Sequence, residues 1–326
     1  MKDLFLGIDT SNYKTSAAVI DCAGNIVWER SEYLEVPQGK RGLRQSEAFF
    51  MHSNRLPDYF REMADAADMS SVAAIGVSSR PRRVEGSYMP CFLAGINAAK
   101  ETGAVLGVPV YEFSHQEGHA AAIIEDPSCM EPLAEGGCDL LFHLSGGTTE
   151  FLLCRMDENG YEMSIAGGTK DISIGQLLDR TGVAMGLPFP SGAYLDRMAC
   201  EYDGRPSSVL TKIRTDNGYF NLSGAETQML RAVESTAAED YPALTSELFI
   251  AMGRLLLSSA SELSDAYGAG RVFMAGGVSS SSYIRSYIAA DNSCRARIIF
   301  GDPVFSGDNA VGTARLAKRI HENNTK

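Results

Sequence analysis

His115 and His119 stand four residues apart in the stretch EFSHQEGHAAAII, which makes them the first candidates for chemistry in this chain. Side chains at positions i and i+4 of a helix lie on one face, so two imidazoles with this spacing can bind one metal ion. Ser114 is suited to cap such a helix, and the alanines that follow favour helical structure. Two histidines alone favour a pair of buried or solvent-facing side chains over a metal site, so a metal site needs a third ligand.

The spacing also invites comparison with the zinc peptidase motif His-Glu-x-x-His, in which the glutamate is the general base. Here Gln116 follows the first histidine, and the nearest glutamate is Glu117. Two residues along a helix correspond to a rotation of about 200°, so Glu117 should face away from a metal held by both histidines. Peptidase chemistry is therefore disfavoured.

The composition is that of an ordinary globular protein, with 44% hydrophobic and 21% charged residues among 326. This length favours two domains or one large duplicated domain. A net charge of −12 argues against a general nucleic-acid binder, although local basic patches remain open. Seven cysteines without a Cys-x-x-Cys pair favour reduced thiols. The apolar runs look too short for a membrane helix and the N-terminus lacks a secretory pattern, so we expect a cytoplasmic protein without membrane association.

Two segments of the chain share one order of predicted elements. Residues 4–29 read as strand, polar turn, strand, Asp/Asn turn and strand, and residues 139–163 repeat that order. Alternating helices and strands follow each copy. The helices are expected at 46–66, 91–102, 172–186, 244–266 and from about 280, and the strands at VAAIGVSS, RVFMAGG and ARIIF.

This tandem order predicts a duplicated α/β fold with a cleft between its halves. The first subdomain would span residues 1–135 and carry the helix of the two histidines. The second would span residues 136–326, with a helical insertion near 172–245. A single undivided α/β sheet is the alternative, and it would not explain the resemblance between the two hairpins.

Three turns of small residues each follow a predicted apolar strand. They are Asp9-Thr10-Ser11, Ser145-Gly146-Gly147-Thr148-Thr149 and Gly276-Gly277-Val278-Ser279. Glycine exposes backbone N–H groups that a side chain would screen, and such turns can bind phosphates. One Gly-Gly pair is usually only a tight turn, but three such turns along one cleft indicate an adenylate-type ligand.

Seven motifs resemble, in order and approximate spacing, those of the TsaD family, formerly called glycoprotease, in the actin/hexokinase/Hsp70-like (ASKHA, RNase H-like) superfamily. They are GIDTSNYKT, the SHQEGH helix, LSGGTTE, DRTGVAMGLPFPSG, FNLSGAET, MAGGVSSSSYIR and SGDNAVGTA. The resemblance covers nearly the whole chain, and it implies the duplicated ASKHA fold.

The resemblance implies a transfer reaction rather than proteolysis. TsaD-like proteins pass the threonylcarbamoyl group of threonylcarbamoyl-adenylate to N6 of the adenosine beside the anticodon, in tRNAs that read codons starting with A. The resemblance therefore implies tRNA as a partner, and threonylcarbamoyl-AMP, ATP or ADP as the nucleotide. It also implies TsaB-like and TsaE-like protein partners, and it leaves a dimer open.

Carried over by position, the family's metal ligands correspond to His115, His119 and Asp308, so Asp308 would be the missing third ligand. Two imidazoles and one carboxylate with open coordination positions suit Fe(II) or Zn(II), with Fe(II) ranked first. The open positions would hold the threonylcarbamoyl group.

The same transfer by position implies ligand-binding roles for further residues. Asp9 and Lys14 would lie at the catalytic end. Asp179 and Gly192 would contact the ribose and adenine, and because their segment aligns with the family without a gap we favour this over a solvated helix residue and a Pro-rich turn. The phosphate and carbamoyl end would be held by Ser145, Gly146, Gly147 and Thr148, and the wall under the adenine would be formed by Gly276, Gly277 and Ser281.

Several residues depart from the family pattern and indicate a diverged paralogue. Lys14 replaces a glutamate, Glu226 a lysine, Thr148 a histidine and Ser281 an asparagine. Because Lys14 and Glu226 carry opposite charges, they could form a compensating pair. Two alternatives to the transferase stay open: a non-catalytic scaffold that pairs with a protein of the same fold, and a carbamoyl- or phosphotransferase for a small molecule.

Clustered basic residues offer a surface for RNA phosphates, although a solvated loop is an equally good explanation. They are Lys40, Arg41, Arg44, Arg80, Arg82 and Arg83.

Overall fold

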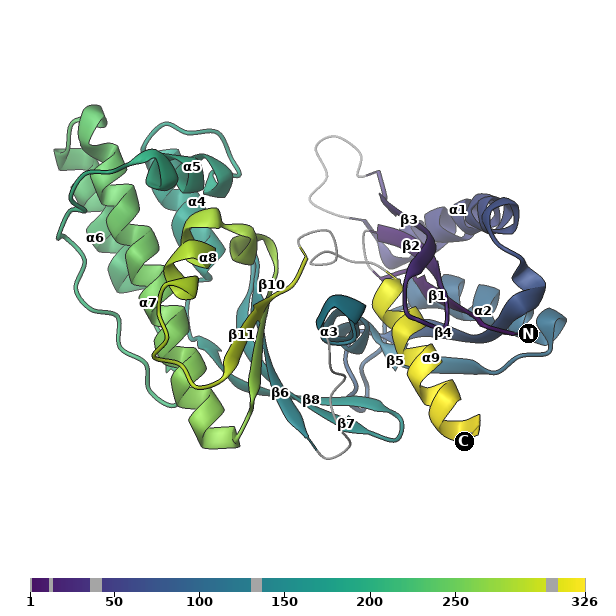
Figure 1. Cartoon of the computed structure of the whole chain (residues 1–326). Helices are drawn as coiled ribbons and strands as arrows, with labels where there is room; N and C mark the ends of the chain where they lie inside the picture. Colours follow the sequence, from purple (N-terminus) through teal and green to yellow (C-terminus); the bar gives the residue numbers. More distant parts are fainter. Residues whose placement is uncertain (1, 12–13, 36–42, 130–136, 303–309, 326) are drawn as a thin grey trace. The chain divides into compact units, whose positions relative to one another are not determined.

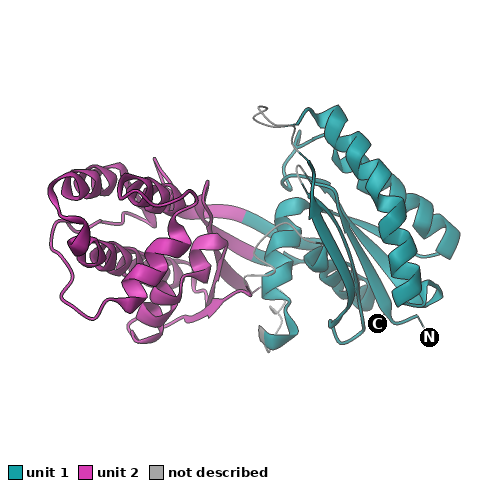
Figure 2. Cartoon of the chain, turned by 90° about the horizontal axis from the view of Figure 1, so that it is seen from above, with its two compact units in different colours: residues 1–136, 155–163, 304–326 teal, residues 137–154, 164–303 magenta. Residues whose placement is uncertain are grey.

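The computed structural model describes residues 2–11, 14–35, 43–129, 137–302 and 310–325. Its contacts divide the chain into two compact units (Figure 2). Unit 1 comprises residues 1–136, 155–163 and 304–326, and unit 2 comprises residues 137–154 and 164–303. The chain therefore passes between the units more than once, whereas the sequence pattern placed one boundary after residue 135.

Unit 1 is built on a five-stranded sheet in the order β3-β2-β1-β4-β5 (Figure 1). The first three strands form an antiparallel meander, and β1, β4 and β5 are parallel neighbours. The strands are β1 Leu4–Asp9, β2 Lys14–Ile20, β3 Ile26–Tyr33, β4 Val72–Arg80 and β5 Val110–Ser114. The helices are α1 Gln45–Ala66, α2 Phe92–Leu106, α3 His115–Ile124 and α9 Val311–Thr325, with short 3-10 turns at Met69–Ser71 and Pro127–Cys129.

Successive side chains of β1 point to opposite faces of this sheet, and different helices cover the two faces. Leu6 and Ile8 pack with residues of α1 and α2, and Phe5 packs on the opposite face with residues at the start of α9. Gly7 lies between Leu6 and Ile8 in the strand, and a Cβ at Gly7 would meet the carbonyl oxygen of Ala310 at 2.1 Å. The absence of a side chain at Gly7 thus lets α9 approach the sheet, which is why the C-terminal helix belongs to unit 1.

Unit 2 is built on a six-stranded sheet in the order β11-β10-β6-β7-β8-β9, with β6, β10 and β11 parallel. The strands are β6 Cys138–Leu144, β7 Thr149–Asp157, β8 Gly160–Thr169, β9 Tyr219–Phe220, β10 Arg271–Ala275 and β11 Arg297–Phe300. The helices are α4 Ile174–Ala184, α5 Gly192–Glu201, α6 Ser223–Ser235, α7 Tyr241–Tyr267 and α8 Ser282–Ala289, with 3-10 turns at Ala238–Asp240 and Gly277–Ser280 (η4). One apolar core lies between this sheet and its helices.

The predicted duplication is present, because β1-β2-β3 and β6-β7-β8 repeat the same order of strands in two separate sheets. The single undivided sheet is therefore wrong. The predicted insertion is only partly helical: residues 202–215 between α5 and α6 form no regular secondary structure.

Helix α7 departs from the expectation that no apolar run reaches the length of a membrane helix. Residues Ala238–Tyr267 include a stretch that is long and apolar enough to cross a membrane by length and composition, with a mean hydropathy of 1.2. However, 72% of that stretch is buried inside the structure, which is typical of a core helix.

Candidate functional site

Helix α3 begins where the sequence predicts. Ser114 Oγ accepts a hydrogen bond from the backbone N–H of Glu117 at 3.2 Å, and the Glu117 carboxylate accepts from the backbone N–H of Ser114 at 2.7 Å. This reciprocal capping box satisfies backbone donors that the first helical turn leaves without partners. Burial raises the pKa of Glu117, although the bonds from Ser114 and the charge of Arg83 oppose that shift. Glu117 therefore caps the helix, as expected of a residue turned away from the histidine pair.

The two histidines meet on one face of α3, as their spacing predicts. Their Nε2 atoms lie 2.9 Å apart, and their rings cross at 75°. Two nitrogens bound to one metal ion at 2.0–2.1 Å and about 90° would be about 3 Å apart. The observed separation thus fits two adjacent ligands of a single ion.

Asp9 is the third member of this cluster, which we call the histidine cluster (Asp9, His115 and His119). It ends β1, whereas His115 follows β5, and the carboxyl ends of these parallel strands share one edge of the sheet. His115 Nδ1 lies 2.7 Å from Asp9 Oδ2. A carboxylate that accepts from one imidazole nitrogen fixes the tautomer and leaves the other nitrogen suited to bind a metal ion.

The Asp9 carboxylate is 1% exposed, yet it is well satisfied. Ser11 donates its backbone N–H to Oδ1 at 2.7 Å, and Ser78 donates its hydroxyl to Oδ2 at 2.6 Å. Burial alone would raise the pKa of Asp9, but the charge of His115 and the bonds from His115, Ser11 and Ser78 hold it below its ordinary value. Asp9 is therefore ionised and orients His115.

The third metal ligand expected from the family, Asp308, lies outside the described residues. Within the described ranges no group of three His, Cys, Asp or Glu side chains is placed to hold a metal ion. The hydroxyl of Ser11, two residues after Asp9, is buried and has no hydrogen-bond partner among the residues that the structure describes. It could therefore bond to a ligand at this site.

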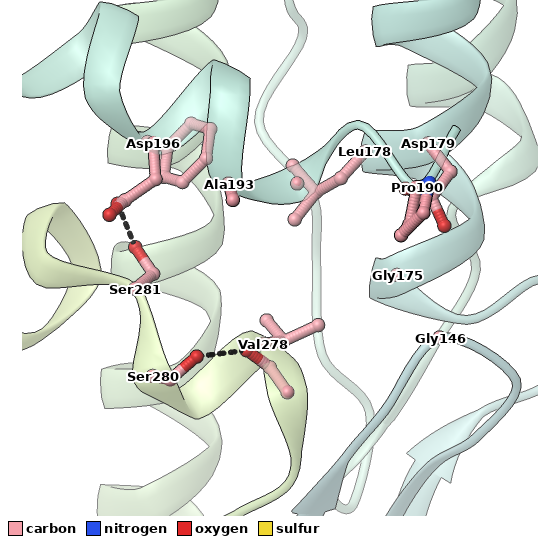
Figure 3. Close-up of a pocket in the computed structure, with 13 residues that line it drawn as sticks. Gly146, Gly175, Leu178, Asp179, Pro190, Ala193, Asp196, Val278, Ser280 and Ser281 are labelled. Atoms are coloured by element: carbon pink, nitrogen blue, oxygen red, sulfur yellow. Dashed lines mark hydrogen bonds between the residues drawn. The ribbon is translucent and has the colours of Figure 1, made fainter. Parts of the chain in front are cut away.

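Unit 2 contains a cavity of about 370 Å³, which we call the glycine cavity (Figure 3). The sequence-predicted residues that line it are Gly146, Asp179, Gly192, Gly277 and Ser281. They come from the β6–β7 turn, α4, α5 and η4, so the fold brings together residues that are up to 135 positions apart. Apolar side chains of Leu178, Val278 and Phe249 complete the lining.

Four other predicted residues shape the neighbouring turns rather than line the cavity. Ser145 donates its backbone N–H to the carbonyl oxygen of Thr148 at 2.9 Å and so closes the turn that includes Gly147. Gly276 has φ +98°, and a Cβ there would meet the carbonyl oxygen of Leu144 at 2.3 Å. Only glycine suits that position.

The lining glycines leave backbone accessible. A Cβ added at Gly146, Gly192 or Gly277 would meet no atom within 4 Å. At Gly175 the added atom would instead meet Gly146 Cα at 2.4 Å, so Gly175 lets α4 pack against the β6–β7 turn. Accessible backbone around a cavity can accept or donate hydrogen bonds to a ligand.

Asp196 was missed by the sequence analysis. It lies in α5 and lines the glycine cavity, where its carboxylate accepts hydrogen bonds from the hydroxyl of Ser281 at 2.5 Å and from the backbone N–H groups of Ser282 and Tyr283 at 3.0 and 3.1 Å. It thus holds the start of α8 beside the cavity (Figure 3). Its partners stand more than 80 residues later in the chain, and no local pattern marks it.

Three residues that depart from the family pattern each contact a residue of their own unit. The side-chain nitrogen of Lys14 lies 5.2 Å from the ring centre of Tyr33. Glu226 pairs with Arg180 at 2.9 Å. Ser281 Oγ accepts the backbone N–H of Ile284 and caps α8.

Two of the basic residues considered for RNA binding, Arg80 and Arg83, contact other side chains. Arg83 pairs with Asp157 at 2.8 Å, and Arg80 donates to the hydroxyl of Ser79. Arg44 precedes α1 and donates its backbone N–H to Glu47. Two further members of the group, Lys40 and Arg41, fall in a range that the structure does not describe.

Comparisons with known proteins agree with these features. Residues 30–315 match the model of a family described as "TsaD: tRNA N6-adenosine threonylcarbamoyltransferase". A protein of that function from Bacillus licheniformis is 27% identical over 98% of this chain and 94% of its own length. One from Aromatoleum aromaticum is 28% identical over 94% of this chain and 88% of its own length.

Solved structures share the fold. HypF from T. kodakarensis matches 98% of this chain and 48% of its own, with a TM-score of 0.58 and 13% identity. Component A of (R)-2-hydroxyglutaryl-CoA dehydratase from Acidaminococcus fermentans matches 98% of this chain and 99% of its own, with a TM-score of 0.52 and 12% identity. These likenesses confirm the predicted ASKHA-type α/β fold.

Proposed function

Because the chain belongs to the TsaD family, as its motifs predicted, we propose that it is a transferase that modifies tRNA. In its specific form, the proposal is that it passes the threonylcarbamoyl group of threonylcarbamoyl-adenylate to N6 of the adenosine beside the anticodon. The curated relatives carry the name of that activity.

The observation that best supports a nucleotide donor is the glycine cavity. Its volume of about 370 Å³ falls within the usual range for small-molecule sites. Leu178, Val278 and Phe249 offer apolar surface for an adenine ring. No side chain covers the backbone at Gly146 and Gly277, so a phosphate could approach the backbone N–H groups there.

Asp179 is suited to a ribose. One of its oxygens accepts the backbone N–H of Ser191 at 2.7 Å, which holds the side chain in place at the cavity. The second oxygen could accept a hydrogen bond from a ribose hydroxyl. Gly192 begins α5 close by and would let the sugar approach the helix.

The two imidazoles of the histidine cluster suit a metal ion, with Fe(II) ranked ahead of Zn(II). His115 and His119 would bind it, and Asp308 would be the third ligand. When bound, the ion would supply a Lewis acid that polarises the carbonyl of the threonylcarbamoyl group. Asp9 would keep His115 in the tautomer that presents Nε2, and the Ser11 hydroxyl would be a donor for the transferred group.

The decisive experiment is mass spectrometry of the nucleosides in tRNA incubated with this protein, threonine, bicarbonate, ATP, an adenylate-forming enzyme and TsaB-like and TsaE-like proteins. We expect N6-threonylcarbamoyladenosine with the wild-type protein and none with the His115→Ala/His119→Ala variant. An Arg295→Gln variant, which changes an exposed residue outside both sites, serves as the control. Equal product with and without the protein would refute the proposal.

The second candidate is a non-catalytic scaffold, favoured by the reversed charges at Lys14 and Glu226. In the structure Glu226 has its own partner, Arg180, so its charge serves the packing of α4 and α6. A scaffold would form a complex with a protein of the same fold but would yield no modified nucleoside in the complete reaction. That combination of results would replace the transferase with the scaffold.

A further inference from the structure

Residues 202–215, which lie between α5 and β9, run beside the helices of unit 2 without regular secondary structure (Figure 1). They are nevertheless firmly anchored. Glu247 of α7 accepts hydrogen bonds from the hydroxyl of Ser207 and from the backbone N–H groups of Val209 and Leu210, at 2.5, 2.9 and 2.7 Å. Gln228 of α6 exchanges two hydrogen bonds with Thr211. This stretch is therefore a structured wall rather than a freely solvated loop.

A cavity of about 460 Å³ lies between this wall and α7, and we call it the basic cavity. The α7 residues that line it recur at positions 247, 250, 251, 254, 255 and 258, which is one stripe of a helix. Phe249 of the glycine cavity lies about 200° around the helix from Glu247. The two cavities therefore use opposite sides of α7.

The lining of the basic cavity has an excess of positive charge. Lys212 and Arg254 both line it and are exposed, and among the described residues neither has an ion-pair partner within 4 Å. Glu247 is the only carboxylate in the lining, and both of its oxygens accept hydrogen bonds from the anchored segment. Two cations against one carboxylate leave a net charge of +1 within a chain whose net charge is −12.

The remaining polar groups of the lining are hydroxyls. Ser208 and Thr211 contribute hydroxyl groups from the anchored segment, whereas the hydroxyl of Ser258 donates to the carbonyl oxygen of Leu255 and can only accept. Cations combined with hydroxyl donors are the usual partners of phosphate oxygens. Arg254 can bind two such oxygens at once, whereas Lys212 acts as a point charge.

We propose that the basic cavity binds a phosphate group of the RNA backbone. The inference rests on the proposed function, since it assumes that the substrate is an RNA. A phosphate contact of this kind positions the RNA without reading its sequence, so it would orient the substrate while the chemistry takes place elsewhere. The anchors at Glu247 and Gln228 matter because they hold the segment that carries Lys212 beside the helix that carries Arg254.

The test is the binding of a tRNA transcript at several salt concentrations, measured for the wild type and for Lys212→Gln/Arg254→Gln. The double variant should bind on the order of tenfold more weakly at low salt. The slope of log affinity against log salt should fall by about one for each cation that contacts phosphate. Both substitutions are at exposed positions, and an unchanged melting temperature would show that folding is intact.

The matched control is Arg295→Gln/Arg297→Gln, which removes two exposed charges of unit 2 that lie outside the basic cavity. It should leave the salt slope nearly unchanged. If the two double variants bind RNA equally well, the basic cavity is not an RNA site and the proposed function still stands. If the wild-type protein binds no tRNA, both the inference and the proposed function fail.

Competition with inorganic phosphate distinguishes a phosphate of the RNA backbone from a free phosphate ion as the ligand of the basic cavity. We expect it to compete with tRNA for the wild type only at millimolar concentrations, because one phosphate lacks the other contacts of the RNA. Phosphate binding that the double variant loses, together with unchanged tRNA binding, would assign the cavity to a free phosphate and overturn the RNA proposal.

Discussion

The Nδ1 atom of His115 lies 2.7 Å from the Oδ2 atom of Asp9, although 106 positions separate them in the chain. This contact joins the ends of β1 and β5 and links a fully buried carboxylate to one of the two helical histidines. Asp9 contacts His115 directly, so it is placed to act as a positioning residue for that imidazole.

Replacing Asp9 with Asn should lower the metal affinity of the histidine pair by about 10- to 100-fold, because the carboxylate would no longer hold the His115 tautomer. Metal titration followed by elemental analysis measures this directly. Asp58→Asn, at an exposed position on α1, is the control. Equal affinities in the two variants would remove the positioning role of Asp9.

Replacing Gly277 with Val should abolish the rise in melting temperature that adenine nucleotides cause, while leaving the fold intact. The new side chain would meet open space at the glycine cavity instead of protein atoms. Wild-type protein should gain about 2.7 kcal/mol at a ligand concentration 100 times Kd. Thermal scans with and without ATP measure both values.

Gly175→Val provides the contrast, because its Cβ would meet Gly146 Cα at 2.4 Å. We expect this variant to melt at a lower temperature even without nucleotide. A nucleotide-induced shift that survives Gly277→Val would argue against ligand binding beside that glycine.

Unit 2 should lose stability in acid through Asp171. Burial alone would raise the pKa of Asp171, but hydrogen bonds from Leu222, Ser223 and Ile172 hold it below the ordinary value of an aspartate. A depressed pKa contributes stability above the unfolded-state value, and this contribution disappears as the pH falls through the folded-state value. Asp171→Asn should therefore be less stable than the wild type near neutral pH.

The difference should shrink as the pH drops below about 4, where the unfolded-state carboxyl takes up its proton. Urea unfolding at a series of pH values measures it. A constant difference across that range would exclude Asp171 as the source of the acid sensitivity.

Arg180 and Glu226 should show a coupling energy of about 0.2–1 kcal/mol, since Arg180 is about half exposed and water weakens the pair. A double-mutant cycle with Arg180→Ala and Glu226→Ala measures that coupling. The same cycle between Lys14 and Glu226 tests the compensation inferred from the sequence. No coupling in the first cycle would mean that the Arg180 pair does not stabilise the protein.

The sequence alone determined the features that depend on local periodicity. The i, i+4 spacing of His115 and His119 places both on one face of any helix, and Ser114 suits the cap because its hydroxyl reaches the first-turn N–H groups. Alternating apolar residues and small-residue turns predicted the two repeated strand meanders. Gly277 was predicted to lie beside a ligand because glycine leaves backbone accessible there.

Only the tertiary structure decided which distant residues meet. Asp9 contacts His115 because β1, β4 and β5 are neighbours in the sheet, and Asp196 contacts Ser281 because α5 and α8 pack together. No spacing within one element encodes either contact. Local patterns arise from backbone geometry over a few residues, whereas strand order and helix packing follow from how the whole chain buries its apolar surface.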